Sequence, residues 1–468
     1  MAKSYDVVIV GAGPAGIFAS LELSQSGLEV LLLDKGRELS GRVCPIQEKG
    51  TRCLSCSPCH LVSGFGGAGA FSDGKLTLST EVGGQVSKLI GMDQAKILVD
   101  YVDSTYLDFG APHKVYGTGE KLAELERRAS LAELRLIPVK LRHLGTKNCR
   151  RVLQAMEQYL SPKIDIKLRT TVDHIIVENE VVKAIETSDG ERWDCRYLIL
   201  APGREGSEWL AREARQLKLS LNSNPVDVGC RIEVPSAVME ELTSALYEAK
   251  LEFYSKSFDD RVRTFCMCPG GEVIMESTGG SDPVVTVNGI GYAEPKTKNT
   301  NFAILVSTTF TEPFHEPIGY GRDLARLANI LSGGILVQRL GDLMDGHRST
   351  PARIQHSLVE PSLKVATPGD LSFALPYRYL KGVVEMLQAM DKLVPGVASP
   401  YTLMYGTEVK FYSSQLKLTQ CLETEIGNMF AAGDGAGISR GLVQASVSGV
   451  AAAREILRRT GKGSARAK

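Results

Sequence analysis

Residues 11–16 read Gly-Ala-Gly-Pro-Ala-Gly, a spacing that suits the binding of a dinucleotide pyrophosphate. Gly11 permits a tight turn, Gly13 lets the pyrophosphate approach the backbone, and Gly16 lets a helix pack closely on a strand. The start of that helix presents oriented N–H groups and partial positive charge to the phosphates. We therefore expect the dinucleotide to contact Gly11, Gly13, Pro14, Ala15 and Gly16.

The residues around this motif predict the strand–helix–strand unit that would hold it. Residues 5–10 form an apolar, β-branched run typical of a strand buried on both faces. A helix is expected after the motif, with Gly27 placed to end it, and a second strand is expected over 28–33. Asp34 follows that strand, 18 residues beyond the last glycine of the motif, where a carboxylate can accept both ribose hydroxyls. Lys35, next to it, completes the contacts expected from this unit.

Three later segments bear on the identity of the dinucleotide. Alternating runs at 170–177 and 181–187 predict a β-meander, and 196–204 predicts a buried strand that enters an Ala-Pro-Gly turn. Residues 428–437 predict a strand that ends in Gly-Asp, and a helix of small residues follows over 444–453. In this order the segments resemble those of the two-domain FAD-dependent oxidoreductases of the glutathione-reductase type.

This resemblance implies further contacts with FAD. The Ala-Pro-Gly turn would close the FAD domain, although Pro202 stands where threonine is usual and the turn loses one hydroxyl. The late Gly-Asp would place the carboxylate of Asp434 on the ribityl chain. The added cofactor contacts are Val172, Ala201, Gly203, Gly433, Asp434, Gly441, Leu442 and Val443. Because only the Gly-x-Gly-x-x-Gly at 11–16 stands between a predicted strand and a predicted helix, NAD(P)H is expected at most as a transient donor.

A closer resemblance rests on less common stretches of sequence. These are Cys44-Pro45, the cysteine run at 53–59, the glycine-rich loop at 63–76 and the segment 225–235. Together they resemble a family described as FAD-dependent dehydrogenases. The family implies a fold, a cofactor and a broad class of reaction, and it implies no particular substrate.

The glycine-rich loop at 64–75 makes sense as a flavin contact. Its glycines and alanines let backbone N–H groups lie flat against a planar ring, where a larger Cβ would clash. The expected contacts are Gly66, Gly67, Ala68 and Ser72. Lys75 is then a catalytic candidate near the N1–C2=O edge of the flavin, where a cation stabilises the anionic reduced form. The alternatives are a packing loop between domains and a solvated lysine at its end.

Four cysteines before this loop have a spacing that suits a metal. Cys53, Cys56 and Cys59 follow the pattern Cys-x2-Cys-x2-Cys, and Cys44 lies nine residues earlier. One interpretation is an iron–sulfur cluster that passes electrons to the flavin, because the pattern is most of a ferredoxin run. A second is a structural zinc that also uses His60, and a third is thiols without metal.

The other candidate groups lie later in the chain. Arg440 stands between the Gly-Asp turn and the final helix, so we expect it to face the flavin or the substrate. The alternative for Arg440 is a salt bridge at the start of that helix. Cys266 and Cys268 are predicted to point to opposite faces of a strand and to belong to the core.

Composition narrows the class of protein. Hydrophobic residues make up 43% and charged residues 23% of the 468 residues, which is typical of a globular enzyme. The 54 Lys and Arg balance the 54 Asp and Glu, so no nucleic-acid partner is expected. No apolar run reaches the roughly 18 residues of a membrane helix. Ten cysteines are too few for a disulfide scaffold, and with no room for a signal peptide they predict a cytoplasmic protein.

These observations predict an α/β fold with a discontinuous, Rossmann-like FAD-binding domain made of a parallel sheet and a β-meander. Residues 1–205 would form this domain, with a helical excursion at about 85–165, and 416–468 would return to it. The change to short strands with Gly and Pro turns predicts an inserted α+β cap at 206–415 that binds substrate.

The function expected is that of an FAD-dependent dehydrogenase or reductase. A hydride would pass between flavin N5 and a small organic substrate held between the FAD and cap domains. The alternatives are a reductase of prenyl or other lipid double bonds and a flavin-bound electron-transfer subunit with a cysteine-ligated cluster, which would need a partner protein. A flavin hydroxylase is less expected, because residues 433–437 read Gly-Asp-Gly-Ala-Gly and not Gly-Asp-Ala-Ala-His.

Overall fold

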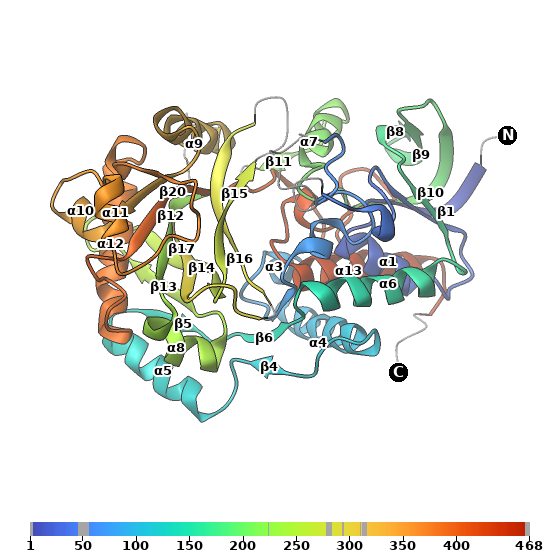
Figure 1. The fold of residues 1–468 in the computed structure, drawn as a ribbon. Helices are drawn as coiled ribbons and strands as arrows, with labels where there is room; N and C mark the ends of the chain where they lie inside the picture. The colour runs from blue at the N-terminus through green and yellow to red at the C-terminus, as the bar shows by residue number, and fades with distance from the viewer. Residues whose placement is uncertain are drawn as a thin grey trace. The chain divides into compact units, whose positions relative to one another are not determined.

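The computed structural model describes residues 3–44, 56–222, 224–277, 283–292, 294–308, 310 and 316–463. The chain divides into two compact units (Figure 1). Unit 1 consists of Met1–Lys114, Arg142–Asn224 and Ser413–Lys468, and unit 2 consists of Val115–Leu141 and Pro225–Tyr412.

A seven-stranded sheet forms the centre of unit 1. Its order is β7-β2-β1-β10-β9-β8, and β22 also pairs with β10. The strands are β1 (Lys3–Val10), β2 (Val30–Asp34), β7 (Asp165–Leu168), β8 (Val172–Glu178), β9 (Val181–Thr187), β10 (Arg192–Leu200) and β22 (Met429–Ala431). β7, β2, β1, β10 and β22 pair in parallel, whereas β8, β9 and β10 form an antiparallel meander. The predicted fold class, with a Rossmann-like parallel sheet and a β-meander, is confirmed.

Helices from both ends of the chain pack together beside this sheet. The helices of unit 1 are α1 (Pro14–Leu23), α3 (Val86–Ile90), α4 (Met92–Asp108), α6 (Thr146–Leu160), α7 (Ser207–Gln216) and α13 (Leu442–Arg459), with the short turns η1 (Leu39–Gly41), η2 (Gly67–Phe71) and η4 (Asp434–Ala436). The remaining strands are β3 (Lys75–Leu78), β11 (Leu221–Asn222), β21 (Gln415–Leu416) and β6 (Lys140–His143), where the chain returns to unit 1. A Cβ on Gly449 would lie 2.0 Å from the carbonyl oxygen of Ala15, so the backbones of α13 and α1 are in direct contact at this glycine.

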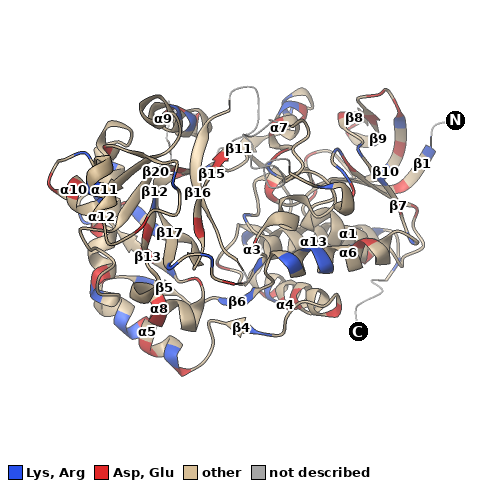
Figure 2. Ribbon diagram, viewed as in Figure 1, with Lys and Arg blue, Asp and Glu red and all other residues tan. Residues whose placement is uncertain are grey.

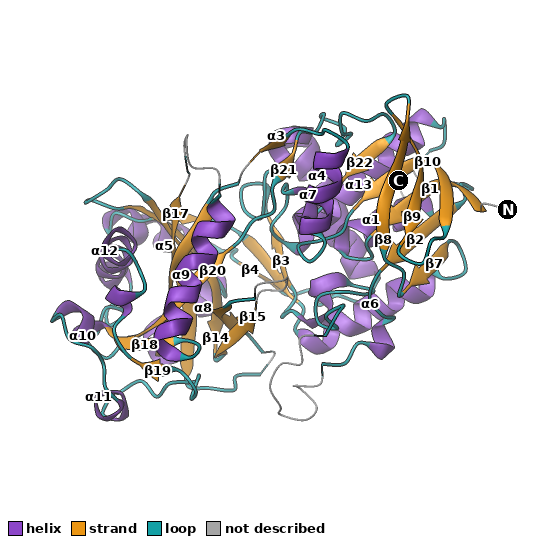
Figure 3. Ribbon diagram, turned by 90° about the horizontal axis from the view of Figure 1, so that it is seen from above, coloured by secondary structure: helices purple, strands orange, loops and turns teal. Residues whose placement is uncertain are grey.

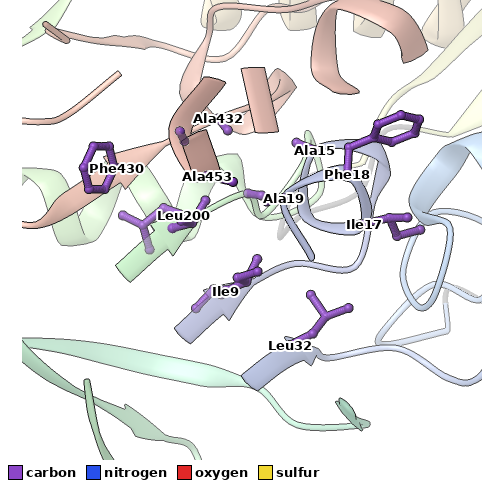
Figure 4. Packing of buried hydrophobic residues seen from close by; sticks show 14 of the residues in the cluster. Ile9, Ala15, Ile17, Phe18, Ala19, Leu32, Leu200, Phe430, Ala432 and Ala453 are labelled. Carbon is purple, nitrogen blue, oxygen red and sulfur yellow. The ribbon is translucent and has the colours of Figure 1, made fainter. Parts of the chain in front are cut away.

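The core of unit 1 joins the strands to these two helices. Figure 4 shows side chains of β1, β2, β10 and β22 together with small and aromatic residues of α1 and α13, all of them buried. The labelled members are Ile9, Ala15, Ile17, Phe18, Ala19, Leu32, Leu200, Phe430, Ala432 and Ala453. Segments at the two ends of the sequence thus share one core.

Unit 2 is built on an eight-stranded sheet in the order β19-β18-β20-β12-β17-β14-β13-β5. The strands are β5 (Arg135–Ile137), β12 (Val226–Pro235), β13 (Lys250–Tyr254), β14 (Arg261–Pro269), β17 (Asn299–Thr308), β18 (Leu336–Arg339), β19 (Thr367–Pro368) and β20 (Leu403–Lys410). Outside the sheet lie β4 (Val115–Tyr116) and the hairpin of β15 (Glu272–Ser277) and β16 (Val285–Ile290).

The two faces of this sheet differ in chemistry. The helices are α5 (Glu120–Leu131), α8 (Ser236–Leu246), α9 (Pro317–Ser332), α10 (Leu340–Met344), α11 (Pro351–Gln355) and α12 (Tyr377–Leu393), with the turn η3 (Leu371–Phe373). Along β12, Val228, Cys230 and Ile232 join the apolar core formed with residues of α8, α9 and α12. Figure 3 shows these helices beside the strands of unit 2. The alternate residues Arg231 and Glu233 are also buried, on the other face.

The observed units differ from the expected domains in two places, besides a shift of three residues at 413–415. Residues 206–224, including α7, belong to unit 1, and residues 115–141 belong to unit 2. The second difference arises because β5 pairs with β13, and because Leu125 and Ala129 of α5 are buried in the unit 2 core. Glycines and a proline at 110–119 indicate turns there, but nothing in this stretch shows that the chain enters the other unit.

Charge is evenly mixed on the described surface. Lys and Arg are interspersed with Asp and Glu, as along α5 (Figure 2). Among the described residues, no helix has both the length and the apolar character that crossing a bilayer requires.

Candidate functional site

The loop between β1 and α1 depends on two glycines for its packing. Gly11 adopts φ +110°, and a Cβ there would lie 2.0 Å from the carbonyl oxygen of Ala201. A Cβ on Gly16 would lie 1.8 Å from the carbonyl oxygen of Gly11. Gly13 differs, because within 4 Å of its Cβ position the only described atom is the Cα of Gly67, at 3.9 Å. The loop is therefore tightly packed at Gly11 and Gly16 and open at Gly13, as the approach of a pyrophosphate requires.

Two helix N-termini flank one glycine-rich turn. Gly13 is the N-cap of α1 and Gly441 is the N-cap of α13, and glycine has no side chain that could cap the first N–H groups of either helix. A Cβ on Gly69 of η2 would lie 2.8 Å from Cδ2 of Leu442 and 3.7 Å from Cγ of Pro14. The first residues of both helices therefore lie beside η2. Since uncapped N–H groups at a helix start favour negative charge, this region can hold two anionic groups of one ligand.

The glycine-rich loop folds onto the phosphate loop. The N–H of Gly66 donates to the carbonyl oxygen of Ala12 at 2.8 Å. Gly67 adopts φ +56°, and a Cβ there would lie 2.9 Å from the Cα of Gly13. Ala68 is exposed, and the Ser72 hydroxyl donates to the carbonyl oxygen of Gly69 at 2.9 Å, which closes the turn. The structure thus brings Gly66 and Gly67 to the phosphate loop, and contact of the four predicted residues with the flavin ring stays a prediction.

Asp34 holds three separate segments together. Its Oδ2 accepts the N–H of Ala12 at 2.8 Å, and its Oδ1 accepts the N–H groups of Gly36 at 2.7 Å and Gly64 at 2.8 Å. A carboxylate has about four lone-pair positions, so one on Oδ2 is left for a ligand. Asp34 therefore orders the phosphate loop and the glycine-rich loop, and its expected bond to ribose stays a prediction.

Replacing Asp34 with alanine is expected to reduce both stability and FAD retention. Three buried or half-buried N–H groups would lose a charged acceptor, and each such bond contributes about 1.5–3 kcal/mol. We expect the free energy of unfolding to fall by about 3 kcal/mol or more, measured by urea denaturation. Asp34→Asn, which keeps the Oδ1 acceptor, should lose less. An Asp34→Ala protein with unchanged stability and FAD affinity would contradict this role.

Neighbouring predicted residues line the same edge of the sheet. The backbone N–H groups of Arg169 and Thr170 donate to the carbonyl oxygens of Gly36 and Asp34, which brings the start of β8 at Val172 toward this loop. The ammonium of Lys35 lies 3.8 Å from the carboxylate of Glu205. In the turn after β10, the backbone N–H of Ala201 donates to the carbonyl oxygen of Val10. Gly203 adopts φ +64°, with no described atom within 4 Å of its Cβ position.

Asp434 lies at the turn after β22, where the late part of the chain meets α1. Its Oδ1 accepts the hydroxyl of Ser439 at 2.5 Å, and its Oδ2 lies 3.5 Å from Nε of Arg204. A Cβ on the preceding Gly433 would lie 3.2 Å from the Cβ of Ala15. Burial raises the pKa of Asp434 above its usual range, although the charge of Arg204 opposes the shift. The site thus holds a carboxylate whose charge the protein alone does not favour.

The two catalytic candidates occupy different surroundings. Arg440 is half-buried, its backbone N–H donates to the carbonyl oxygen of Gly83 at 2.7 Å, and its charge reaches Asp434. The Lys75 ammonium lies 3.2 Å from the carboxylate of Asp73, and the Lys75 side chain is 10% exposed. The structure therefore places Arg440 beside the Gly-Asp turn and gives Lys75 a carboxylate partner. That Arg440 faces the flavin or the substrate stays a prediction.

Gln444, in the first turn of α13, was not predicted. Its Nε2 donates to the carbonyl oxygen of Ser79 at 2.9 Å, whereas its buried Oε1 has no hydrogen-bond partner among the described residues. A glutamine in a helix of small residues gives no sequence signal of this kind. The orphaned acceptor lies two residues beyond Leu442, which flanks η2, and it suits a donor on a bound ligand.

The cysteine segment gains no support as a metal site. Cys44 is buried, Cys56 and Cys59 are half-buried, and Cys53 lies outside the described residues. Nδ1 of His60 lies 2.8 Å from the carbonyl oxygen of Val43. Within the described parts of the chain, no three His, Cys, Asp or Glu side chains are grouped so that they could hold a metal ion.

Arg42, which was not predicted as a functional residue, holds this segment instead. The guanidinium is fully buried and donates to the carbonyl oxygens of His60, Leu61 and Phe65 at 3.0, 2.7 and 2.7 Å. Burial lowers the pKa of Arg42 to about 10 although the charge of Asp34 opposes the shift. A single cation thus joins the cysteine segment to the start of the glycine-rich loop.

Replacing Arg42 with methionine is expected to destabilise unit 1. The change keeps an apolar stem and leaves three carbonyl oxygens without their donor, at a cost of about 1–3 kcal/mol for each buried group left unpaired. We expect the unfolding midpoint in urea to fall clearly. Arg37→Met, at an exposed position of the same loop, is the matched control and should leave the midpoint unchanged. Equal midpoints for the two variants would contradict the role of Arg42.

Comparison with known proteins agrees with this division of the chain. Residues 225–411 match the family model described as FAD-dependent protein, C-terminal domain-like, and this range covers most of unit 2. Residues 9–66 match the model described as NAD(P)-binding Rossmann-like domain, which ends within the glycine-rich loop.

Individual relatives are more distant. An uncharacterized protein of Clostridium beijerinckii is 26% identical over 96% of this chain and 80% of its own length. A digeranylgeranylglycerophospholipid reductase of Methanococcus vannielii is 51% identical over 37 residues, which are 8% of this chain and 10% of the relative. The solved structure of 3-ketosteroid-Δ4-(5α)-dehydrogenase from Rhodococcus jostii aligns over 97% of both chains with a TM-score of 0.43 and 13% identity.

The two family matches, the parallel sheet with its phosphate loop and the buried Asp434 turn lead to one assignment. Unit 1 provides the dinucleotide-binding fold, and most of unit 2 matches a domain known from FAD-dependent proteins. The chain therefore combines a Rossmann-like nucleotide-binding domain with the C-terminal domain of FAD-dependent proteins.

Proposed function

We propose that the chain transfers a hydride between N5 of FAD and a small organic substrate. The observation that supports this most strongly is the pair of uncapped helix N-termini, α1 and α13, beside the turn at Gly69. FAD carries negative charge on its pyrophosphate, and its ring gains negative charge on reduction. The partial positive charge at two helix N-termini in one site suits the negative charges of the pyrophosphate and of the reduced ring.

The residues of unit 1 then have separate tasks. The open side of the loop at Gly13 admits the pyrophosphate, and the remaining lone pair of Asp34 accepts a ribose hydroxyl. Asp434 accepts a hydroxyl of the ribityl chain, which adds a donor to the one that Ser439 supplies. FAD, when bound, supplies the hydride chemistry at N5. Lys75 and Arg440 supply positive charge that favours the reduced ring.

Purification under anaerobic conditions tests this proposal. We expect flavin absorption bands, and about one FAD released per chain on heat denaturation. Analysis for iron and zinc in the same sample decides whether the cysteines hold a metal. A chain that purifies without flavin and does not quench the fluorescence of added FAD would exclude the proposed function.

We also propose that NAD(P)H acts only as a transient electron donor. The support is the single phosphate-loop motif, which FAD would occupy. On anaerobic mixing with NADH or NADPH, the flavin bands should bleach, and gel filtration should then recover protein without bound nicotinamide nucleotide. Retention of that nucleotide at one per chain would contradict transient binding.

A further inference from the structure

A second group of reactive side chains lies in unit 2, on the sheet face toward the β15–β16 hairpin. Nη2 of the fully buried Arg231 donates to Oδ1 of Asn301 at 2.7 Å and to the carbonyl oxygen of Cys266 at 2.6 Å. The same Nη2 lies 3.5 Å from Sγ of Cys268. A Cβ on Gly289 of β16 would lie 1.8 Å from Nη2, so β16 crosses directly over the guanidinium.

The prediction that Cys266 and Cys268 point to opposite faces is wrong. Residues two apart in a strand share a face, and it is Met267 between them that enters the apolar core with the helices. The sulfur atoms of Cys266 and Cys268 lie 3.9 Å apart. Cys268 is fully buried and Cys266 is half-buried.

A β-bulge produces this approach. In a flat strand, side chains two residues apart stand about 6.6 Å from each other, whereas the Cβ atoms of a disulfide stand about 3.5–4.5 Å apart. Here the three-residue step from Phe265 to Cys268 in β14 spans the two-residue step from Ala303 to Asn301 in β17. Cys266 takes up the extra residue with φ +46°, a conformation that L side chains rarely adopt. The backbone is thus shaped so that the two sulfurs meet.

The charges around the pair favour a reactive sulfur. Arg231 lies 3.4 Å from Oε1 of Glu408, and Lys410 lies 3.1 Å from the same carboxylate. Burial alone would lower the pKa of Arg231. The nearby Glu408 carboxylate and the two sulfur atoms outweigh this effect and raise the pKa. The same attraction acts in the other direction, because a neighbouring cation favours a thiolate over a thiol.

We propose that Cys266 and Cys268 form a dithiol–disulfide redox site that reacts with low-molecular-weight disulfides. The half-buried Cys266 thiolate attacks one sulfur of the small disulfide and expels one thiolate. Sγ of Cys268 then loses its proton and attacks Sγ of Cys266, which expels the second thiolate and forms the Cys266–Cys268 bond. The protein loses two electrons and two protons, and the small disulfide becomes two thiols.

Other buried cysteines of the chain provide internal standards. Burial raises the pKa of the Cys149 and Cys195 thiols to about 12, which makes them poor nucleophiles. Cys230 precedes Arg231 on β12 but points into the apolar core, and burial raises its pKa further. We expect these three thiols to stay reduced under conditions that oxidise Cys266 and Cys268.

The test uses the full-length, FAD-loaded protein. It is equilibrated anaerobically with a series of ratios of reduced and oxidised glutathione, quenched with acid, and alkylated with iodoacetamide after denaturation. Peptide mapping should show that Cys266 and Cys268 escape alkylation together, in one two-electron transition. Their peptide should then be about 2 Da lighter than the unlabelled dithiol peptide, and dithiothreitol should restore labelling of both cysteines. Cys268→Ser should instead accumulate one glutathione on Cys266. Cys230→Ser is the matched control and should leave the transition unchanged.

Two results would overturn the proposal. One is full alkylation of both cysteines at every glutathione ratio in the parent protein, measured without any variant. The other is a glutathione adduct on Cys266 of the parent protein that never converts into the intramolecular disulfide. Neither result depends on the flavin reaction, so the redox site and the proposed hydride transfer can fail separately.

Discussion

Gly13→Ala will lower the affinity for FAD about 100-fold or more and leave the apoprotein folded. The nearest described atom to the new Cβ is Cα of Gly67 at 3.9 Å, an ordinary contact, and φ −78° at Gly13 suits alanine. The methyl group would instead occupy the open side of the loop that the pyrophosphate must approach. A loss of about 3 kcal/mol of binding free energy corresponds to this factor. Titration of the apoprotein with FAD, followed by flavin fluorescence, measures it.

Gly16→Ala provides the contrast. A Cβ there would lie 1.8 Å from the carbonyl oxygen of Gly11, within the protein itself, so this variant should lose soluble folded protein whether or not FAD is present. The same methyl group, added at two positions three residues apart, is thus expected to weaken FAD binding at Gly13 and to prevent folding at Gly16. A Gly13→Ala protein that binds FAD as tightly as the parent would show that the pyrophosphate does not lie at this loop.

Asp434→Asn is expected to weaken FAD binding about 10- to 100-fold and to stabilise the apoprotein at neutral pH. The loss of binding reflects one hydrogen bond to a charged acceptor, about 1.5–3 kcal/mol. The gain in stability follows because burial raises the pKa of Asp434, so the folded apoprotein favours the neutral form. Oδ1 of asparagine can still accept the Ser439 hydroxyl. Thermal melts with and without FAD separate the two effects.

The same carboxyl predicts a pH dependence. A folded-state pKa above the unfolded value of 3.8 adds stability that is complete below 3.8 and is lost as the pH rises through the folded value. The parent apoprotein should therefore lose stability between acidic and neutral pH, and the Asp434→Asn apoprotein should not show this loss. If the parent and the variant lose stability equally over this range, Asp434 is not the group responsible.

Local signals explain what the sequence predicted well. The strand, turn and helix from Tyr5 to Leu23 follow from contiguous residues, because a buried strand, a glycine turn and a helix start each have a pattern of their own. The same holds for β10 and for the Gly-Asp turn after β22. These elements form one parallel sheet, and so the fold class could be derived from the sequence.

The remaining features depend on contacts between distant residues. Nothing local shows that Arg42 donates to three carbonyls some 20 residues later, or that Asp34 is shared by three N–H groups. The excursion at 115–141 joins unit 2 through pairing with β13, which lies more than 100 residues away. The approach of Cys266 to Cys268 needs a bulge that only the register with β17 reveals.

The packing of α1 on α13 has a consequence for how the protein is made. The phosphate loop and Asp34 are synthesised about 400 residues before the Gly-Asp turn and the start of α13. At roughly 5–20 residues per second, translation separates the two parts of the site by about 20–80 s. During that interval the apolar face of α1 lacks the helix that buries it in the finished fold. A nascent chain can therefore neither complete its flavin site nor cover this surface unaided, and chaperone binding to ribosome-bound chains that end before residue 442 is the expected result.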